Sequence, residues 1–190
     1  MAGRNARVFE WLLLIIVIGV IVMMAVGVYT RMAADVQKLS FKLAAQNFET
    51  AVSGVRAQWY VQQSQGNVDY TVSVYEQLPI APGEGQGTRP VTVYLNRQGW
   101  PVNTASTATA QDGTLETWEC MELWSGLFYG APSIRSEGQE SSGNAVYSVS
   151  SVVVEGDQAC RYRHLVDGPI RQYFDYLPRH GSVTVNSSPK

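Results

Sequence analysis

The sequence has little charge and almost no excess of either sign. Of its 190 residues, 14 are Lys or Arg and 16 are Asp or Glu, so charged residues make up 16%, against about 25% in typical soluble domains. With a net charge of −2 and no basic cluster, the composition argues against nucleic acid as the main partner. Part of the deficit comes from an N-terminal apolar block. The remainder is rich in Ser, Thr, Gln, Gly and Val, which is typical of secreted β-rich domains.

The sequence also lacks the residues and motifs of common catalytic sites. It contains two histidines, His164 and His180, and no nucleophile elbow, phosphate loop, dinucleotide-binding glycine pattern or HExxH motif. Cys120 and Cys160 lack the close spacing of paired zinc ligands. We therefore predict no enzyme activity, no cofactor and no metal, and we interpret both histidines as surface or satisfied residues.

A long apolar run stands near the N-terminus. From Trp11 to Val28 it is uninterrupted, and its 18 residues span most of a hydrocarbon core of roughly 30 Å. A single span in lipid must be a helix, because its backbone amides find partners only within the segment. Arg4 and Arg7 precede the run and favour a cytoplasmic N-terminus. The alternative, a cleaved signal peptide, usually has a shorter core of about 7–15 residues.

Glu10 lies inside the start of this apolar segment, between Phe9 and Trp11. One interpretation is an interfacial carboxylate without a function, which snorkels or takes up a proton at the bilayer edge. The other is a charge that pairs with a cationic group of a neighbouring subunit, since ionisable residues within membranes are functional candidates. Both interpretations stay open at this point.

Helical spacing continues beyond Tyr29. Apolar residues recur mostly every three or four positions, polar residues fill the remaining ones, and no proline occurs before Pro79. We predict one long helix that is apolar all round over 8–28 and amphipathic over 29–64, ending near Gln65–Asn67. The alternative is a membrane anchor followed by a separate core helix. The residues predicted to pack the helix on a domain are Met32, Val36, Leu39, Leu43, Phe48, Val52, Val55 and Trp59.

The rest of the chain reads as a β-rich domain over 65–190 with one short helix near 115–129. We expect that helix to begin at Thr114, because threonine is a common capping residue, and to end before Gly130 and Pro132. Stretches rich in Gly, Pro, Ser or Thr predict loops over 79–87, from Trp100–Pro101 to Gly113, and over 133–144, with a turn at 178–181. We expect the later strands to form an antiparallel meander on the long helix. Alternating β-branched and aromatic residues predict strands over 68–78, 91–96, 146–155, 159–166, 170–177 and 182–186.

The two cysteines form an even pair, Cys120 on the short helix and Cys160 at the start of a strand. If the anchor places them outside the cytoplasm, the pair indicates a disulfide, which would stabilise by roughly 4 kcal/mol through closure of its loop. Free buried thiols and a catalytic thiol are the alternatives. The five Trp and ten Tyr residues either build the core or mark a carbohydrate- or protein-binding face, and we favour the core.

Three segments carry a resemblance to a known family. They are the turn from Asn96 to Pro101, the helix segment CMELW around Cys120, and the stretch from Phe174 to Val183. With the N-terminal helix, their order along the chain resembles the type IV pilin-like proteins, nearest to minor pilins or biogenesis components of mannose-sensitive haemagglutinin-type pili. The resemblance implies an α+β fold, with a long helix packed on a C-terminal antiparallel sheet and a late disulfide.

The resemblance also implies a non-enzymatic function in pilus assembly. The partners would be inner-membrane lipid and other pilins or pilus assembly proteins, and the domain would lie in the periplasm or in an extracellular pilus. A single-pass envelope sensor or scaffold with a ligand-binding domain is the alternative. The residues expected to form the membrane and assembly helix are Glu10, Trp11, Leu14, Ile18, Val22 and Val26.

The N-terminus departs from the family pattern. Prepilins are cut after a glycine that precedes an aromatic residue, with a glutamate near the start of the mature chain. Here Gly3 is followed by Arg4, and Glu10 lies seven residues beyond Gly3. Either the peptidase does not process this chain, or Glu10 is not the equivalent carboxylate.

Overall fold

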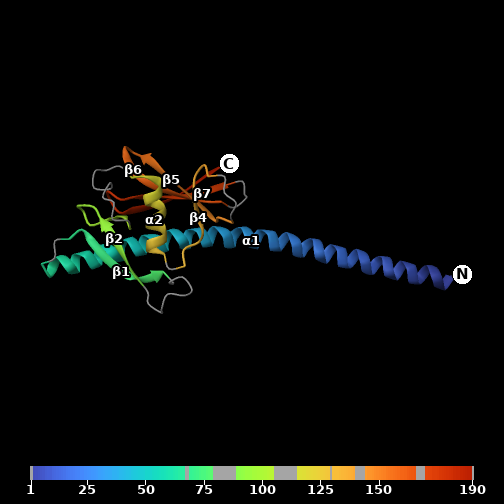
Figure 1. Ribbon diagram of the computed structural model, residues 1–190. Coiled ribbons are helices and arrows are strands. Elements are labelled where there is room, and N and C mark those ends of the chain that lie inside the picture. Colours follow the sequence, from blue (N-terminus) through green and yellow to red (C-terminus); the bar gives the residue numbers. More distant parts are fainter. Residues whose placement is uncertain are drawn as a thin grey trace. The chain divides into compact units, whose positions relative to one another are not determined.

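The computed structural model describes residues 2–66, 69–78, 89–104, 115–128, 130–139, 144–165 and 170–189 (Figure 1). The chain divides into two compact units, Met1–Phe41 and Lys42–Lys190. The first unit is helical. The second contains the remaining turns of the same helix, a short helix and all the strands.

The first helix, α1, runs from Ala2 to Ser64 and is 63 residues long. The prediction of a single long helix is therefore confirmed. It ends where the sequence predicts, because Gly66 adopts a left-handed backbone with φ of +85° that L-residues disfavour. The N–H groups of Gln65 and Gly66 close the last turn by donating to the carbonyls of Gln62 and Gln63.

The strands of the second unit form two sheets. β1 (Thr71–Leu78), β2 (Arg89–Leu95) and β3 (Pro101–Asn103) make an antiparallel sheet in the order β1-β2-β3. The larger sheet has the order β4-β5-β6-β7-β8, and its last four strands form the predicted antiparallel meander. Their bounds are β4 (Ile134–Ser136), β5 (Tyr147–Val154), β6 (Asp157–His164), β7 (Ile170–Leu177) and β8 (Ser182–Pro189).

Two of these strands contradict the predicted loops. β3 occupies residues assigned to the loop after Trp100, and β4 lies within the predicted 133–144 loop. Each has three residues, too few for an alternating pattern, and each is defined by the longer strand beside it. β4 pairs in parallel with β5, so the larger sheet is mixed. The predicted loop over 79–87, residues 105–113 and Thr114 lie outside the described residues.

The short helix α2 runs from Thr117 to Leu127 and lies between the two sheets, contacting β2 and β3 on one side and β4 and β5 on the other (Figure 1). Its start differs from the prediction, since the N-cap residue is Glu116. The Glu119 carboxylate accepts a hydrogen bond from the Glu116 N–H at 2.8 Å, which satisfies one donor at the helix start.

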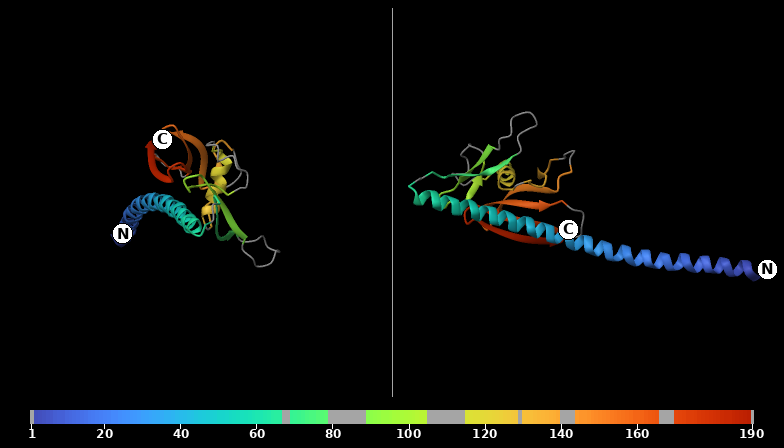
Figure 2. Two further views of the ribbon diagram at one scale, coloured as in Figure 1. Left: turned by 90° about the vertical axis from the view of Figure 1, so that its left-hand side faces the viewer. Right: turned by 90° about the horizontal axis from the view of Figure 1, so that it is seen from below.

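The core of the second unit is built around Phe48 of α1. Its ring centroid lies 5.2–6.3 Å from those of five other aromatic residues, the spacing of favourable aromatic pairs. Figure 2 shows the cyan to teal turns of α1 beside the curved larger sheet. The partners come from α2, the segment just after it, β6 and β7: Trp124, Phe128, Tyr162, Phe174 and Tyr176.

Candidate functional site

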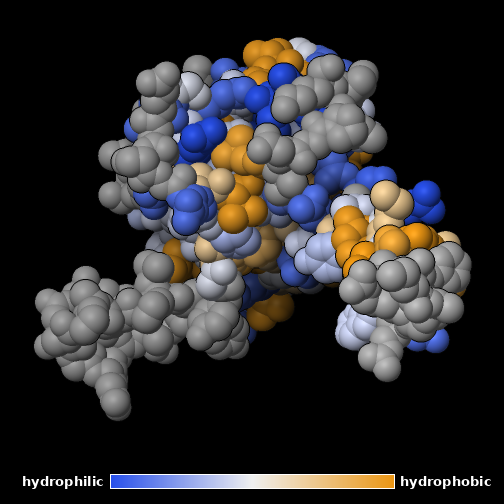
Figure 3. Space-filling model, turned by 90° about the vertical axis from the view of Figure 1, so that its right-hand side faces the viewer, coloured by the Kyte–Doolittle hydropathy of each residue, from blue (hydrophilic) through white to orange (hydrophobic). Residues whose placement is uncertain are grey.

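The first candidate site is the apolar surface of α1 near the N-terminus. From Trp11 to Val28, the exposed fractions of the large apolar side chains range from 45% at Val17 to 80% at Met23. Figure 3 shows apolar side chains of this surface in orange. It includes every apolar residue predicted for the assembly helix: Trp11, Leu14, Ile18, Val22 and Val26. Glu10, at its start, is also exposed.

This surface is long and apolar enough to cross a membrane. The part of α1 from Glu10 to Ser64 contains an 18-residue segment that is apolar enough to span the hydrocarbon core, and none of that segment is buried. A helix that is apolar all round is covered by lipid or protein in its working state. The described residues of this chain do not provide that cover.

The residues predicted to pack the helix on a domain fall into two groups by their exposure. Phe48, Val52, Val55 and Trp59 are at most 5% exposed. Four earlier members of the stripe are between 48% and 65% exposed: Met32, Val36, Leu39 and Leu43.

The reason is the step from Leu43 to Phe48. Five residues turn a helix by about 140° beyond a full circle, so the predicted stripe joins two different faces. The buried face continues instead through Ala45 and Phe41, both 1% exposed. Spacings of four, three, four, three and four then connect the buried positions from Phe41 to Trp59. The earlier apolar residues form a second stripe on roughly the opposite face, which we call the outer stripe: Met32, Val36, Leu39 and Leu43.

Two of the segments that carry the family resemblance contact each other. The Asn96 side chain donates from Nδ2 to the Pro178 carbonyl at 2.7 Å. Its Oδ1 accepts from the N–H groups of Gln98 and Trp100 at 2.9 and 3.0 Å. One asparagine therefore both shapes its own turn and joins that turn to the β7–β8 hairpin.

Glycines allow the close packing around this junction. A Cβ on Gly181, where φ is +66°, would lie 2.1 Å from the Trp100 ring, and one on Gly99 would lie 2.2 Å from the Trp59 ring. The Trp100 ring also packs under the Arg56 guanidinium of α1, with Cζ 3.8 Å from the ring centroid, a cation–π distance. The junction thus ties α1, one turn and the last hairpin together.

The predicted disulfide is present. Cys120 of α2 and Cys160 of β6 are bonded, with their Cα atoms 5.6 Å apart and both residues fully buried. The Tyr162 hydroxyl donates to the Cys120 carbonyl at 2.9 Å. The bond therefore holds α2 on the inner face of the larger sheet, beside the Phe48 cluster.

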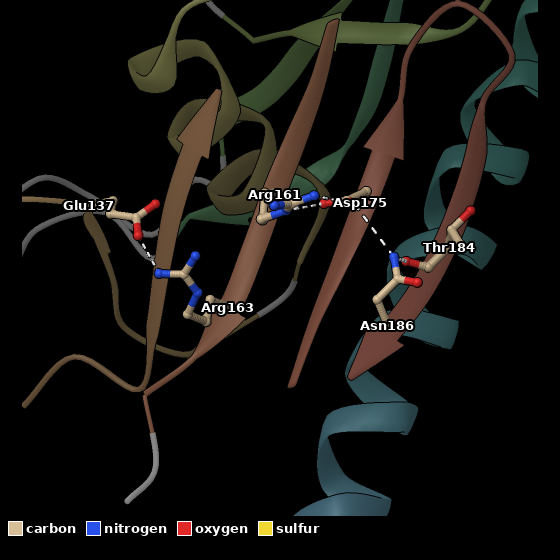
Figure 4. Close-up of polar contacts among 6 residues, drawn as sticks. All are labelled: Glu137, Arg161, Arg163, Asp175, Thr184 and Asn186. Atoms are coloured by element: carbon tan, nitrogen blue, oxygen red, sulfur yellow. Dashed lines mark hydrogen bonds and ion pairs between the residues drawn. The ribbon is translucent and has the colours of Figure 1, made fainter. Parts of the chain in front are cut away.

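The outer face of this sheet carries charged pairs (Figure 4). Arg161 of β6 donates two hydrogen bonds to the buried Asp175 of β7, at 2.7 and 2.9 Å, and this bonding raises the pKa of Arg161. Arg163 pairs with Glu137. A hydrogen bond from the Ser150 side chain, helped by Arg163, lowers the pKa of the Glu137 carboxyl. The first pair joins the neighbouring strands β6 and β7, and the second joins β6 to the turn after β4. Both arginines are bound to carboxylates.

The two histidines have different environments. His164 of β6 is half-buried, with its ring centroid 5.1 Å from that of Tyr147, and burial lowers its pKa. His180 is exposed in the β7–β8 turn, with Nε2 3.4 Å from the Asp157 carboxylate. Among the described residues, no three His, Cys, Asp or Glu side chains gather where they would hold a metal ion.

Sequence reasoning did not find the Asn96–Pro178 junction as a contact, although it singled out both segments. Its signal was local: an asparagine two residues before a Gln and three before a glycine with positive φ. The Arg161–Asp175 pair had no signal in the sequence, because it depends on the register between β6 and β7.

No family model, no curated protein and no solved structure matches this chain.

Proposed function

We propose that this chain is a membrane-anchored, non-enzymatic, pilin-like subunit that assembles with similar subunits through α1. A minor pilin or a biogenesis component of a type IV pilus is the specific form of this proposal. The observation that carries it is the extent of the exposed apolar surface of α1, which runs from Trp11 to Val28 and continues in the outer stripe to Leu43.

The outer stripe favours protein partners over lipid alone. A simple tether needs apolar surface only across the hydrocarbon core, about 20 residues. Met32, Val36, Leu39 and Leu43 lie beyond that length and follow helical spacing, and each is about half exposed or more. Exposed apolar residues in a contiguous row mark interaction sites on soluble surfaces. A neighbouring helix laid along α1 would bury them.

In this proposal the N-terminus is cytoplasmic and the domain lies outside the inner membrane. The Cys120–Cys160 bond agrees with this location, because disulfides persist in oxidising compartments. Glu10 would lie at the membrane boundary, where a cationic group of the next subunit would offset the cost of its charge. The turns Asn96–Pro101 and Pro178–Gly181 carry part of the resemblance to pilin-like proteins. They contact each other, and the first of them also contacts α1 through Trp100 and Arg56.

Cysteine crosslinking in the native cell tests the proposal. Single cysteines at Ile18, in the apolar run, and at Leu39, in the outer stripe, are oxidised alongside cysteines in the helix of the major pilin. Adducts with the pilin are expected from both positions. Gly54→Cys is the matched control, because it lies on α1, is exposed and falls outside both surfaces. Absence of adducts from Ile18 and Leu39 would contradict assembly with pilins.

A single-pass envelope sensor or scaffold is the second candidate. The observation that favours it is Arg4 directly after Gly3, where prepilin processing would need an aromatic residue. This alternative predicts that Ile18 and Leu39 form adducts only with a second copy of the chain, or with none. It also predicts that deletion of the pilus assembly ATPase leaves the abundance and location of this protein unchanged.

A further inference from the structure

A hollow in the second unit lies beside the first turns of α2. It is an open surface depression with a volume of about 630 Å³, within the range of small-molecule sites, about 300–1,000 Å³. The hollow lies between α2 and the β4–β5 side of the larger sheet, and its lining includes Glu116, Trp118, Met121, Ser136 and Gln139.

Trp118 is unusual for a tryptophan of this unit. Its exposed fraction is 38%, whereas Trp59 and Trp124 are 5% and 0% exposed. The indole is held in place, because its Nε1 donates to the Glu116 carboxylate at 2.6 Å. A large ring fixed before binding offers apolar contact at a low cost in conformational entropy. Trp118 is therefore a preformed platform within the hollow.

The other groups around the platform are mostly uncharged and polar. Ser136 and Gln139 contribute a hydroxyl and an amide. The Thr117 hydroxyl accepts a hydrogen bond from the Ser151 N–H at 3.1 Å, so its own proton stays available for donation. Met121 adds a second apolar contact.

This lining selects a chemical class of ligand. An anion is disfavoured, because the Glu116 carboxylate is part of the lining and none of the described lining residues is Lys or Arg. A purely apolar ligand would leave the hydroxyls and the amide without partners, which costs binding free energy. A neutral sugar ring satisfies both conditions, since one face presents C–H groups to an indole and its edge carries hydroxyls.

We propose that this hollow binds a neutral sugar unit, stacked on Trp118 with its hydroxyls on Gln139 and Ser136. The site belongs to the domain alone and uses no residue of the apolar surface of α1. It therefore stands or fails independently of assembly through α1.

Saturation-transfer NMR on the full chain tests the site directly. The protein is held in phosphatidylcholine nanodiscs, which avoid sugar-headed detergents, and the probes are methyl glycosides of glucose, galactose and N-acetylglucosamine at millimolar concentration. At least one glycoside is expected to receive saturation, strongest on the C–H protons of one ring face. Trp118→Ala is expected to abolish the signal, and Trp118→Phe to retain part of it.

Two further variants keep the test decisive. Gln139→Ala, on the other side of the hollow, is expected to weaken binding about 3- to 10-fold, the effect of one lost hydrogen bond. Val153→Ala, at an exposed apolar residue of β5 outside the lining, should bind as wild type. The proposal is overturned if no glycoside binds wild type, or if Gln139→Ala and Trp118→Ala bind unchanged. Binding of tetramethylammonium in place of every sugar would also overturn it.

Discussion

The two halves of α1 differ in apolar content and have opposite surroundings. The run from Trp11 to Val28 is apolar all round, whereas the later half carries one apolar face. From Trp11 to Val28 the large apolar side chains are exposed, whereas Phe48 and Val52 are completely buried. The later half finds its partners within the chain, in α2, β6 and β7. The earlier half has no such partner among the described residues. The difference shows that helical periodicity defines a face, while the rest of the fold decides whether that face is covered.

The outer stripe sharpens this contrast. Leu43 and Ala45 are two residues apart on one helix, but Leu43 is 48% exposed and Ala45 is 1% exposed. Two residues turn a helix by about 200°, so these side chains point in nearly opposite directions. One helix thus carries a buried face for its own domain and a second apolar face that is exposed.

The largest expected effect comes from removing the centre of the buried half. Phe48→Ala should lower the free energy of unfolding of the domain by about 3–5 kcal/mol, because it empties the middle of an aromatic cluster. Ile18→Ala, in the exposed half, should change it by less than about 0.5 kcal/mol. Urea unfolding of the full chain in zwitterionic detergent, followed by near-ultraviolet circular dichroism, measures both. Equal effects would remove the contrast between the halves.

The disulfide supports the partners of the buried half. Replacing both Cys120 and Cys160 by alanine should cost about 2–4 kcal/mol, because the unfolded chain loses a constraint across a loop of some 40 residues. The same unfolding assay gives the value. A double variant as stable as wild type would mean that the bond does not hold α2 on the sheet.

A smaller loss is expected at the junction that ties α1 to the last hairpin. Gly181→Ala adds a Cβ against the Trp100 ring and should cost about 1–3 kcal/mol. Gly130 has a similar φ of +62° but open space around it, so Gly130→Ala should show only the backbone strain, about 1 kcal/mol. If the two variants lose the same stability, the close approach of Trp100 has no energetic weight.

The smallest effect concerns His164. Burial lowers its pKa below the ordinary 6.5, so the unfolded chain takes up a proton at a higher pH than the folded chain. The contribution of His164 to stability is therefore complete above pH 6.5 and is lost as the pH falls through the lowered pKa of the folded chain. Thermal unfolding across this range should give a flatter pH dependence for His164→Gln than for wild type. An unchanged slope would exclude His164 as its source.

Much of this fold was predictable because its signals are local. The unbroken α1 follows from helical spacing without proline, the four-strand meander from alternating residues, and the disulfide from an even cysteine pair. The three-residue strands β3 and β4 were missed, since a neighbouring strand creates them. The Glu116 cap depends on a side-chain contact with Glu119. The predicted packing stripe joined two different faces of α1, because the step from Leu43 to Phe48 is five residues and not three or four.

We propose that the exposed half of α1 is covered by lipid or by other helices in the cell. Maleimide labelling of Ile18→Cys in intact membranes tests it, with Val153→Cys as the exposed control; the native cysteines are bonded and buried and do not compete. We expect Ile18→Cys to stay unlabelled until the membranes are dissolved and denatured, while Val153→Cys reacts throughout. Equal labelling of both positions in intact membranes would contradict it.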